Sequence, residues 1–134
     1  MVFPVKVIDT SYLLSFFIAD DENHAKAMKI SAENEQEDFV LPNAILHETL
    51  TVLNYKRGLE DCKRAYKEIT GNKQVTVNFI GEKEQNDIVK WFLENGKGLS
   101  IGDASVICAA NRLNCEALAF DKDLLRRISR KGKE

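Results

Sequence analysis

The stretch "VKVIDTSYLL", residues 5–14, puts a carboxylate, Asp9, directly after a run of β-branched residues. Val and Ile in such a short apolar run favour a buried strand, and "SYLLSFFIA" (11–19) favours a helix after it. Asp is a poor strand former, and a buried carboxylate is costly unless something compensates its charge. The stretch therefore predicts a strand joined to a helix, with an acid at the junction that needs an explanation.

The same alternation of strand and helix continues along the chain. Further strands are expected at 38–42, 75–80 and 116–120, after the first at 5–9. Helices are expected at 11–19, 21–34, 44–57, 59–72, 82–96, 101–114 and 122–129, with Asn43 and Ser100 as N-caps. Strands separated by helices imply parallel βαβ units. We predict an α/β fold, a three-layer α/β/α sandwich around a central, mainly parallel sheet, as one domain over 1–134 with a frayed tail at 129–134.

Composition sets the broad class of the protein. The chain has 134 residues, of which 44% are hydrophobic and 30% charged, and a formal net charge of −2. This balance is typical of a globular domain and gives no overall basic field. Three cysteines without a CxxC pair and two isolated histidines indicate neither a disulfide framework nor a zinc site. Without a signal-peptide pattern or an apolar run of about 20 residues, we expect a soluble, cytoplasmic protein with no membrane contact.

Two acids follow predicted strands. Asp9 comes after the first strand and Asp121 after the fourth. In open α/β sheets, ligands bind outside the carboxyl ends of the strands, which is where both side chains are expected. Each Asp would equally serve as the N-cap of the helix that follows it.

Two further acids lie on the apolar sides of predicted helices. Glu48 comes four residues before Val52, and Asp103 four residues before Ile107, so each shares a stripe with an apolar side chain. Glu48 is also compatible with a position at the margin of the core. Ser100 and Asp103 form an S-x-x-D pattern that resembles a capping box, which is a purely local explanation for the acid.

Together the four acids are able to converge on one small volume, where their charges would repel and raise some of their pKa values. A divalent cation removes this conflict. Carboxylate oxygens are ligands for hard ions, so Mg²⁺ or Mn²⁺ is expected in preference to Zn²⁺. Such ions support phosphodiester hydrolysis by activating water and stabilising charged oxygens. Asp9 is therefore interpreted as a metal ligand.

At this point the chain resembles the PIN-domain family, and more narrowly the VapC-type toxins of toxin–antitoxin pairs. The resemblance is carried by "VIDTSYLL" (7–14), "ILHETLTVL" (45–53), "LSIGDASVICAA" (99–110) and "ALAFDKDL" (117–124), in the family's order and spacing. It implies a Mg²⁺- or Mn²⁺-dependent endoribonuclease that is a homodimer and is often bound by a small antitoxin protein. The catalytic and metal-binding acids would be Asp9, Glu48, Asp103 and Asp121.

The resemblance also assigns supporting residues. Ser11 matches a hydroxyl beside the first Asp, and Asp123 matches a second acid of the last motif. The chain departs from the family at Ala119, where a Ser or Thr is usual. A missing hydroxyl there would weaken the support of Asp121 and the metal affinity.

A basic segment follows the last motif. Residues 122–134 contain six Lys or Arg and two acids. Arg126 and Arg127 are the candidates for contact with RNA phosphates, which would make binding sensitive to salt. An ordinary solvated helix face is the alternative for both.

Three classes of function compete. The first is the metal-dependent endoribonuclease, either a toxin or an RNA-processing nuclease that is not a toxin. The second is a phosphotransferase or phospho-receiver, but the haloacid-dehalogenase pattern needs an acid where Ser11 stands. The third is a non-catalytic PIN-like module that holds RNA or a partner, which only Ala119 favours.

Overall fold

A computed structural model describes residues 5–128 of the chain. Within this range there are four strands and seven helices. In chain order they are β1 (Val5–Ile8), α1 (Thr10–Phe17), α2 (His24–Glu33), β2 (Asp38–Pro42), α3 (Asn43–Arg57), α4 (Leu59–Gly71), β3 (Val75–Asn78), α5 (Glu82–Asn95), α6 (Ile101–Leu113), β4 (Glu116–Leu118) and α7 (Lys122–Arg126). The predicted frayed tail, 129–134, lies outside the described residues.

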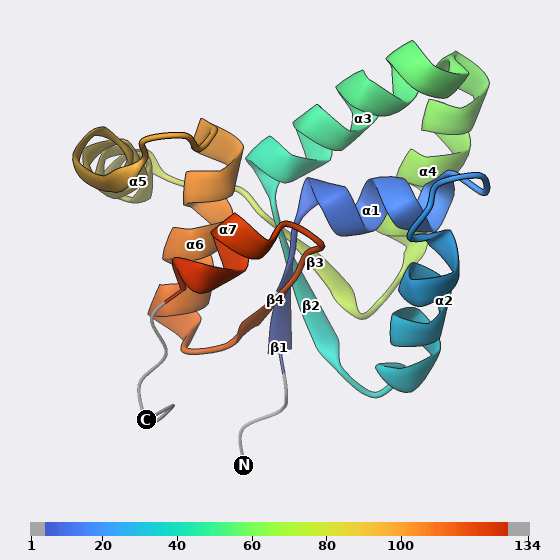
Figure 1. Cartoon of the computed structure of the whole chain (residues 1–134), viewed down its shortest axis with the longest axis horizontal. Coiled ribbons are helices and arrows are strands. Elements are labelled where there is room, and N and C mark those ends of the chain that lie inside the picture. Colours follow the sequence, from blue (N-terminus) through green and yellow to red (C-terminus); the bar gives the residue numbers. More distant parts are fainter. Residues whose placement is uncertain (1–4, 129–134) are drawn as a thin grey trace.

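The four strands form one parallel sheet in the order β3-β2-β1-β4. Val7 of β1 lies opposite Val40 of β2 on one side and Ala117 of β4 on the other. Figure 1 shows α1, α2 and α4 on one side of this sheet and α5, α6 and α7 on the other. Helix α3 extends away from the carboxyl ends of the strands. The predicted three-layer α/β/α sandwich is confirmed, and all strand pairings within the described residues are parallel.

The core lies between the sheet and its helices. Val7, Leu41, Ile45, Ile107 and Leu124 are fully buried. Each such side chain contributes about 1.5–3 kcal/mol of transfer free energy. A smaller cluster joins α1, α3 and α4 through Ile18, Leu53 and Ala65. The packing therefore fixes α3 and α6 against the sheet, and these two helices carry predicted site residues.

Helix α6 is buried along much of its length. Its small residues Gly102, Ala104, Ser105, Ala109 and Ala110 are all buried, which lets the helix lie close to its neighbours. It contacts β1, β2, β4, α3, α5 and α7. The first turn of α6 is consequently held beside the start of α3 near the carboxyl ends of the strands.

Several element boundaries differ from the prediction. Strands β1, β3 and β4 end earlier than expected, and helix α2 begins at His24 instead of residue 21. The acid at 21 explains the late start, because the Asp21 carboxylate accepts hydrogen bonds from the Ser15 hydroxyl and the Asn23 amide in the connecting loop. Asn43 is the first residue of α3 and not its cap, which is Pro42. Within residues 5–128, no helix is both long and apolar enough to cross a membrane.

Candidate active site

Asp9 lies at the junction of β1 and α1, and its side chain is only 4% exposed. The carboxylate caps α1 by accepting hydrogen bonds from the Ser11 amide (3.1 Å) and the Ser11 hydroxyl (2.6 Å). Burial raises the pKa of Asp9; the bonds from Ser11 oppose the shift and the nearby charge of Asp103 adds to it. The Asp9 side chain therefore caps α1 and also lies near a second acid, Asp103.

Ser11 connects the ends of two strands. Its hydroxyl donates to Asp9 and accepts a hydrogen bond from the backbone N–H of Phe120, at 2.9 Å, just after β4. Ala119 precedes Phe120 and is partly buried against the core. The Ser11 hydroxyl thus links Asp9 to the segment before Asp121. This segment includes Ala119, where the family usually has a hydroxyl.

Glu48 is half-buried on α3, as the apolar stripe predicts. Its Oε2 atom accepts a hydrogen bond of 2.8 Å from the Thr10 hydroxyl, and Thr10 is itself buried. A Cβ atom added at Gly102 would lie 2.9 Å from the same oxygen. The Glu48 carboxylate therefore lies between the start of α1 and the start of α6. There it is next to Gly102, the residue before Asp103.

Thr10 is a site residue that sequence reasoning missed. The available signal was a second hydroxyl residue beside Asp9 in "DTS". Only the packing of α1 against α3 shows that this hydroxyl reaches Glu48.

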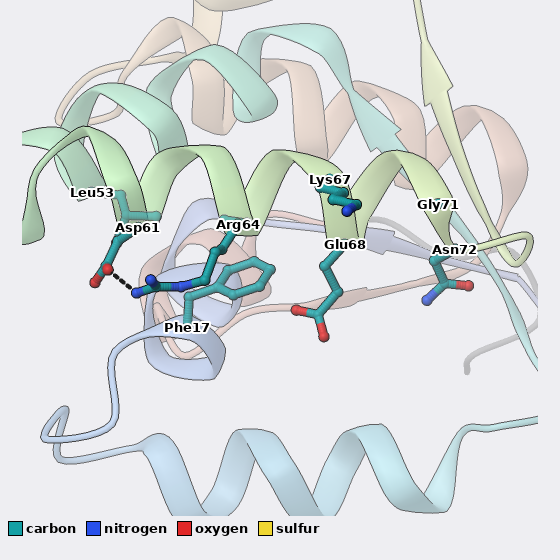
Figure 2. Close-up of a pocket in the computed structure, with 9 residues that line it drawn as sticks. Phe17, Leu53, Asp61, Arg64, Lys67, Glu68, Gly71 and Asn72 are labelled. Atoms are coloured by element: carbon teal, nitrogen blue, oxygen red, sulfur yellow. Dashed lines mark hydrogen bonds and ion pairs between the residues drawn. The ribbon is translucent and has the colours of Figure 1, made fainter.

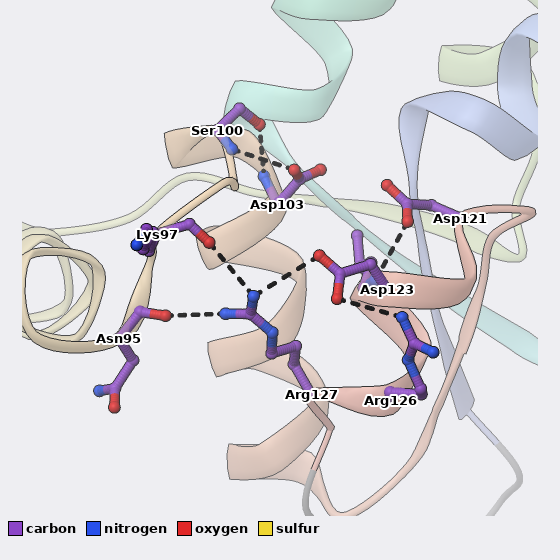
Figure 3. A network of polar contacts seen from close by, with 9 residues as sticks. Asn95, Lys97, Ser100, Asp103, Asp121, Asp123, Arg126 and Arg127 are labelled. Carbon is purple, nitrogen blue, oxygen red and sulfur yellow. Dashed lines mark hydrogen bonds and ion pairs between the residues drawn. The ribbon is translucent and has the colours of Figure 1, made fainter.

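Asp103 occupies the first turn of α6 in a complete capping box. Its Oδ2 atom accepts from the Ser100 amide, and its own amide donates to the Ser100 hydroxyl, each at 3.0 Å. The capping box predicted from the S-x-x-D pattern is therefore present in the structure. Figure 3 shows the Asp103 and Asp121 side chains pointing toward the same space, so the capping role and a role in the site are compatible.

Asp121 and Asp123 differ in their surroundings. Asp121 caps α7 by accepting from the backbone N–H of Leu124 at 3.1 Å. Asp123 forms ion pairs with Arg126 and Arg127, each at 3.5 Å. Among residues 5–128, no Lys, Arg or His side chain forms an ion pair with any of the four predicted ligands Asp9, Glu48, Asp103 and Asp121.

The carboxylates do not form a ready-made ion site. In the part of the chain that the structure describes, no three His, Cys, Asp or Glu side chains lie close enough together to hold a metal ion. The donor set consists of carboxylate oxygens, as Mg²⁺ and Mn²⁺ require. The absence of a side chain at Gly102 lets the Glu48 carboxylate lie there, because a Cβ atom would be 2.9 Å from Oε2. The residues fit a hard divalent cation by chemistry, with some side-chain adjustment.

A groove lies away from these acids, on the side of the sheet that carries α1 and α4. It has a volume of about 710 Å³ and is lined by Phe17, Leu53, Asp61, Arg64, Ala65, Lys67, Glu68, Gly71 and Asn72. Figure 2 shows Phe17 pointing into the groove and Arg64 paired with Asp61 along its wall. None of the four predicted ligands lines it.

Comparison with known proteins identifies the fold family. A model of the PIN domain matches residues 6–131. The structure is similar to Mycobacterium tuberculosis VapC20, described as a sarcin-ricin loop cleaving toxin, with a TM-score of 0.81 and 22% identity over 90% of this chain and 92% of that one. It is also similar to PAE2754 from Pyrobaculum aerophilum, with a TM-score of 0.63 and 19% identity over 98% of this chain and 88% of that one. No curated protein matches. Because the family model spans nearly the whole sequence, the chain belongs to the PIN domain family.

Proposed function

We propose that this protein is a divalent-metal-dependent endoribonuclease that hydrolyses RNA phosphodiester bonds with an activated water molecule. The observation that carries the proposal is the set of acids without cationic partners. Asp9 is buried, feels the charge of Asp103, and has no basic ion-pair partner among residues 5–128. Asp123, which lies two residues after Asp121, instead forms ion pairs with Arg126 and Arg127. Neighbouring acids that lack basic side chains, one of them buried, are stabilised by a bound cation.

Asp9, Glu48, Asp103 and Asp121 are the proposed ligands of Mg²⁺ or Mn²⁺. When bound, the ion would supply an activated water molecule and stabilise the charged oxygens of the phosphodiester. The chain orients the ligands: Ser11 holds Asp9, Thr10 holds Glu48 and Ser100 holds Asp103. Such outer hydrogen bonds fix the direction of a ligating carboxylate.

RNA is the proposed substrate, and Arg126 is available to contact its phosphates because the side chain is 76% exposed. The description of VapC20 as a sarcin-ricin loop cleaving toxin supports both the substrate and a toxin role. We include in the proposal a single domain over 1–134, a homodimer, a small antitoxin partner and a cytoplasmic location. A processing nuclease that is not a toxin and a non-catalytic RNA- or partner-binding module are the alternatives.

The test is cleavage of end-labelled RNA by antitoxin-free protein in EDTA, Mg²⁺ or Mn²⁺. Wild type should cut only with metal, and Asp103→Asn should fold but lose cutting. Asp87→Asn is the matched control, since it makes the same change on α5, where the carboxylate is exposed and pairs with Lys83. Equal cutting by wild type and Asp103→Asn would contradict the proposed site. Binding of RNA without any cutting would favour the non-catalytic module.

The toxin role needs a separate test. Expression of the wild-type chain should arrest growth, and the product of an adjacent gene should relieve the arrest if it is the antitoxin. Growth without arrest, from a chain that cuts RNA in vitro, would favour the processing nuclease.

A further inference from the structure

Two neighbouring arginines at the end of α7, its last residue Arg126 and its C-cap Arg127, have different surroundings. Arg126 is 76% exposed and contacts Asp123 at 3.5 Å. Arg127 is 30% exposed and also pairs with Asp123, but its guanidinium donates to the backbone carbonyls of Asn95 (2.8 Å) and Lys97 (3.2 Å) as well. Figure 3 shows Arg127 in the centre of this network, between α7 and the end of α5. The sequence groups the two residues as one basic pair, whereas their contacts separate them.

The two carbonyls belong to the tight connection between α5 and α6. A Cβ atom at Gly96 would lie 2.5 Å from Phe92 atoms, so the chain passes very close to the last turn of α5. Gly98 has a positive φ of 80°, and the Leu99 amide donates to the Gly96 carbonyl at 2.9 Å. Carbonyls at the end of a helix lack partners within that helix. Arg127 satisfies one such group, the carbonyl of Asn95, together with the carbonyl of Lys97 in the connection, and so fixes the path that leads to Ser100.

Ser100 in turn sets Asp103 through the capping box. Asp121 is the N-cap of the short helix α7, and Arg127 is its C-cap. A planar guanidinium with several fixed donors is well suited to hold two carbonyls and a carboxylate together. The chain of contacts thus runs from Asp123 and Arg127 to the connection before α6, and from there to Asp103.

We propose that Arg127 is a positioning residue that fixes Asp103 relative to Asp121, and that Arg126 alone of the two contacts RNA phosphate. The inference rests on the proposed function, because it assigns a purpose to the relative placement of two metal ligands. The guanidinium of Arg127 is already engaged on three sides, whereas that of Arg126 is open to solvent.

The test compares Arg127→Met with Arg126→Met, which remove the same charge one residue apart. Binding of Mn²⁺ is measured without RNA, from the free-ion signal in electron paramagnetic resonance. RNA binding is measured separately in EDTA, over a range of salt concentrations. Arg127→Met should weaken Mn²⁺ binding by roughly 10-fold or more, as loss of outer support does at metal sites. Arg126→Met should leave Mn²⁺ binding unchanged and reduce the salt slope of RNA binding by about 0.7.

Unchanged Mn²⁺ affinity in Arg127→Met would overturn the inference, and so would a reduced salt slope in that variant. Arg127→Lys guards against a general folding defect, since one ammonium is able to hold a carbonyl and should restore part of the affinity. Hydrogen exchange gives an independent readout. Arg127→Met should accelerate exchange at the amides of Leu99 and Asp103 and leave the β1 amides unchanged.

This last measurement separates the inference from the proposed function. If wild type binds no Mn²⁺, the proposed function fails, and the exchange rates still decide whether Arg127 holds the connection. If Leu99 and Asp103 exchange at wild-type rates in Arg127→Met, Arg127 does not position Asp103.

Discussion

Thr10 and Ser11 bring two hydroxyl groups to two different carboxylates, Glu48 and Asp9. Adjacent residues are able to do this because both lie in the first turn of α1, where their side chains leave the helix in different directions. Ser11 contacts a residue two positions away and was predicted from the sequence. Thr10 contacts a residue 38 positions away, and no local pattern indicates that partner.

Thr10→Val should weaken metal binding in a protein that still folds. Valine keeps the shape of the buried side chain and removes the hydrogen bond to Glu48, which frees the carboxylate to rotate. A hydrogen bond to a charged group is worth about 1.5–3 kcal/mol at most, while loss of such support typically lowers metal affinity about 10–100-fold. Thr10→Ser keeps the hydroxyl and is the control. Titration with Mn²⁺ measures the effect, and wild-type affinity in Thr10→Val would contradict it.

Asp9→Asn should raise the stability of the metal-free protein at neutral pH. The folded pKa of Asp9 lies above its unfolded value, chiefly because the group is buried. The folded state then binds the extra proton between the two pKa values, so its stability falls as pH rises through the folded pKa. Asn carries no charge and accepts the same bonds from Ser11. In EDTA, the stability advantage of Asp9→Asn should therefore shrink as the pH falls toward about 3.9, the ordinary aspartate value. Thermal unfolding across this range checks it, and an advantage that grows on acidification would contradict it.

At the scale of elements, sequence patterns predicted helices better than their connections. The Ser100 capping box is wholly local, with both partners within three residues, and the structure has it as predicted. The late start of α2 depends on Ser15 of the preceding helix donating to Asp21, a contact no pattern specifies. Strand β4 ends at Leu118, and two residues later the Phe120 amide bonds to Ser11, which lies 109 residues away. These two boundaries depend on contacts with residues of other elements, and the sequence pattern did not predict them.

Gly102→Ala, at the start of α6, should lower the metal affinity with little change in the unfolding temperature. Alanine favours a helix over glycine by roughly 1 kcal/mol. Its Cβ, however, would lie 2.9 Å from Glu48 Oε2, the end of a flexible side chain that is able to move. The variant should unfold close to the wild-type temperature, because the gain in helix propensity offsets part of the lost Thr10–Glu48 hydrogen bond, and it should lose metal affinity because Glu48 is displaced from Thr10. Gly71→Ala in α4, where the added Cβ meets no atom within 4 Å, is the control. Unchanged Mn²⁺ affinity in Gly102→Ala would contradict the position of Glu48.

At the scale of the molecule, the parallel sheet brings together acids that are far apart in sequence. Parallel strands direct their carboxyl ends to one edge, so Asp9 and Asp121 follow neighbouring strands at the same edge although 112 positions separate them. The alternation of strands and helices predicted this edge. It did not predict the order β3-β2-β1-β4, which depends on which strands pair. Convergence of the four acids on one metal ion stays a prediction, because no three of them lie close enough to hold an ion among residues 5–128. The hydroxyls that orient Asp9 and Glu48 depend on the packing of α1, and the sequence pattern alone did not place Thr10.

A metal ion bound at this edge should stabilise the whole fold. The four proposed ligands belong to four separate segments, after β1, on α3, on α6 and before α7, so unfolding destroys the site completely. Binding to the folded state alone adds about 2.7 kcal/mol when the free ion is 100 times its Kd. For a domain of this size that corresponds to a rise in Tm of roughly 8–12 °C. Thermal unfolding with increasing Mn²⁺ should show this rise in wild type and Asp87→Asn, and little of it in Asp103→Asn. An equal rise in all three would mean that the ion binds elsewhere, and no rise in wild type would remove the basis for a metal at the four acids.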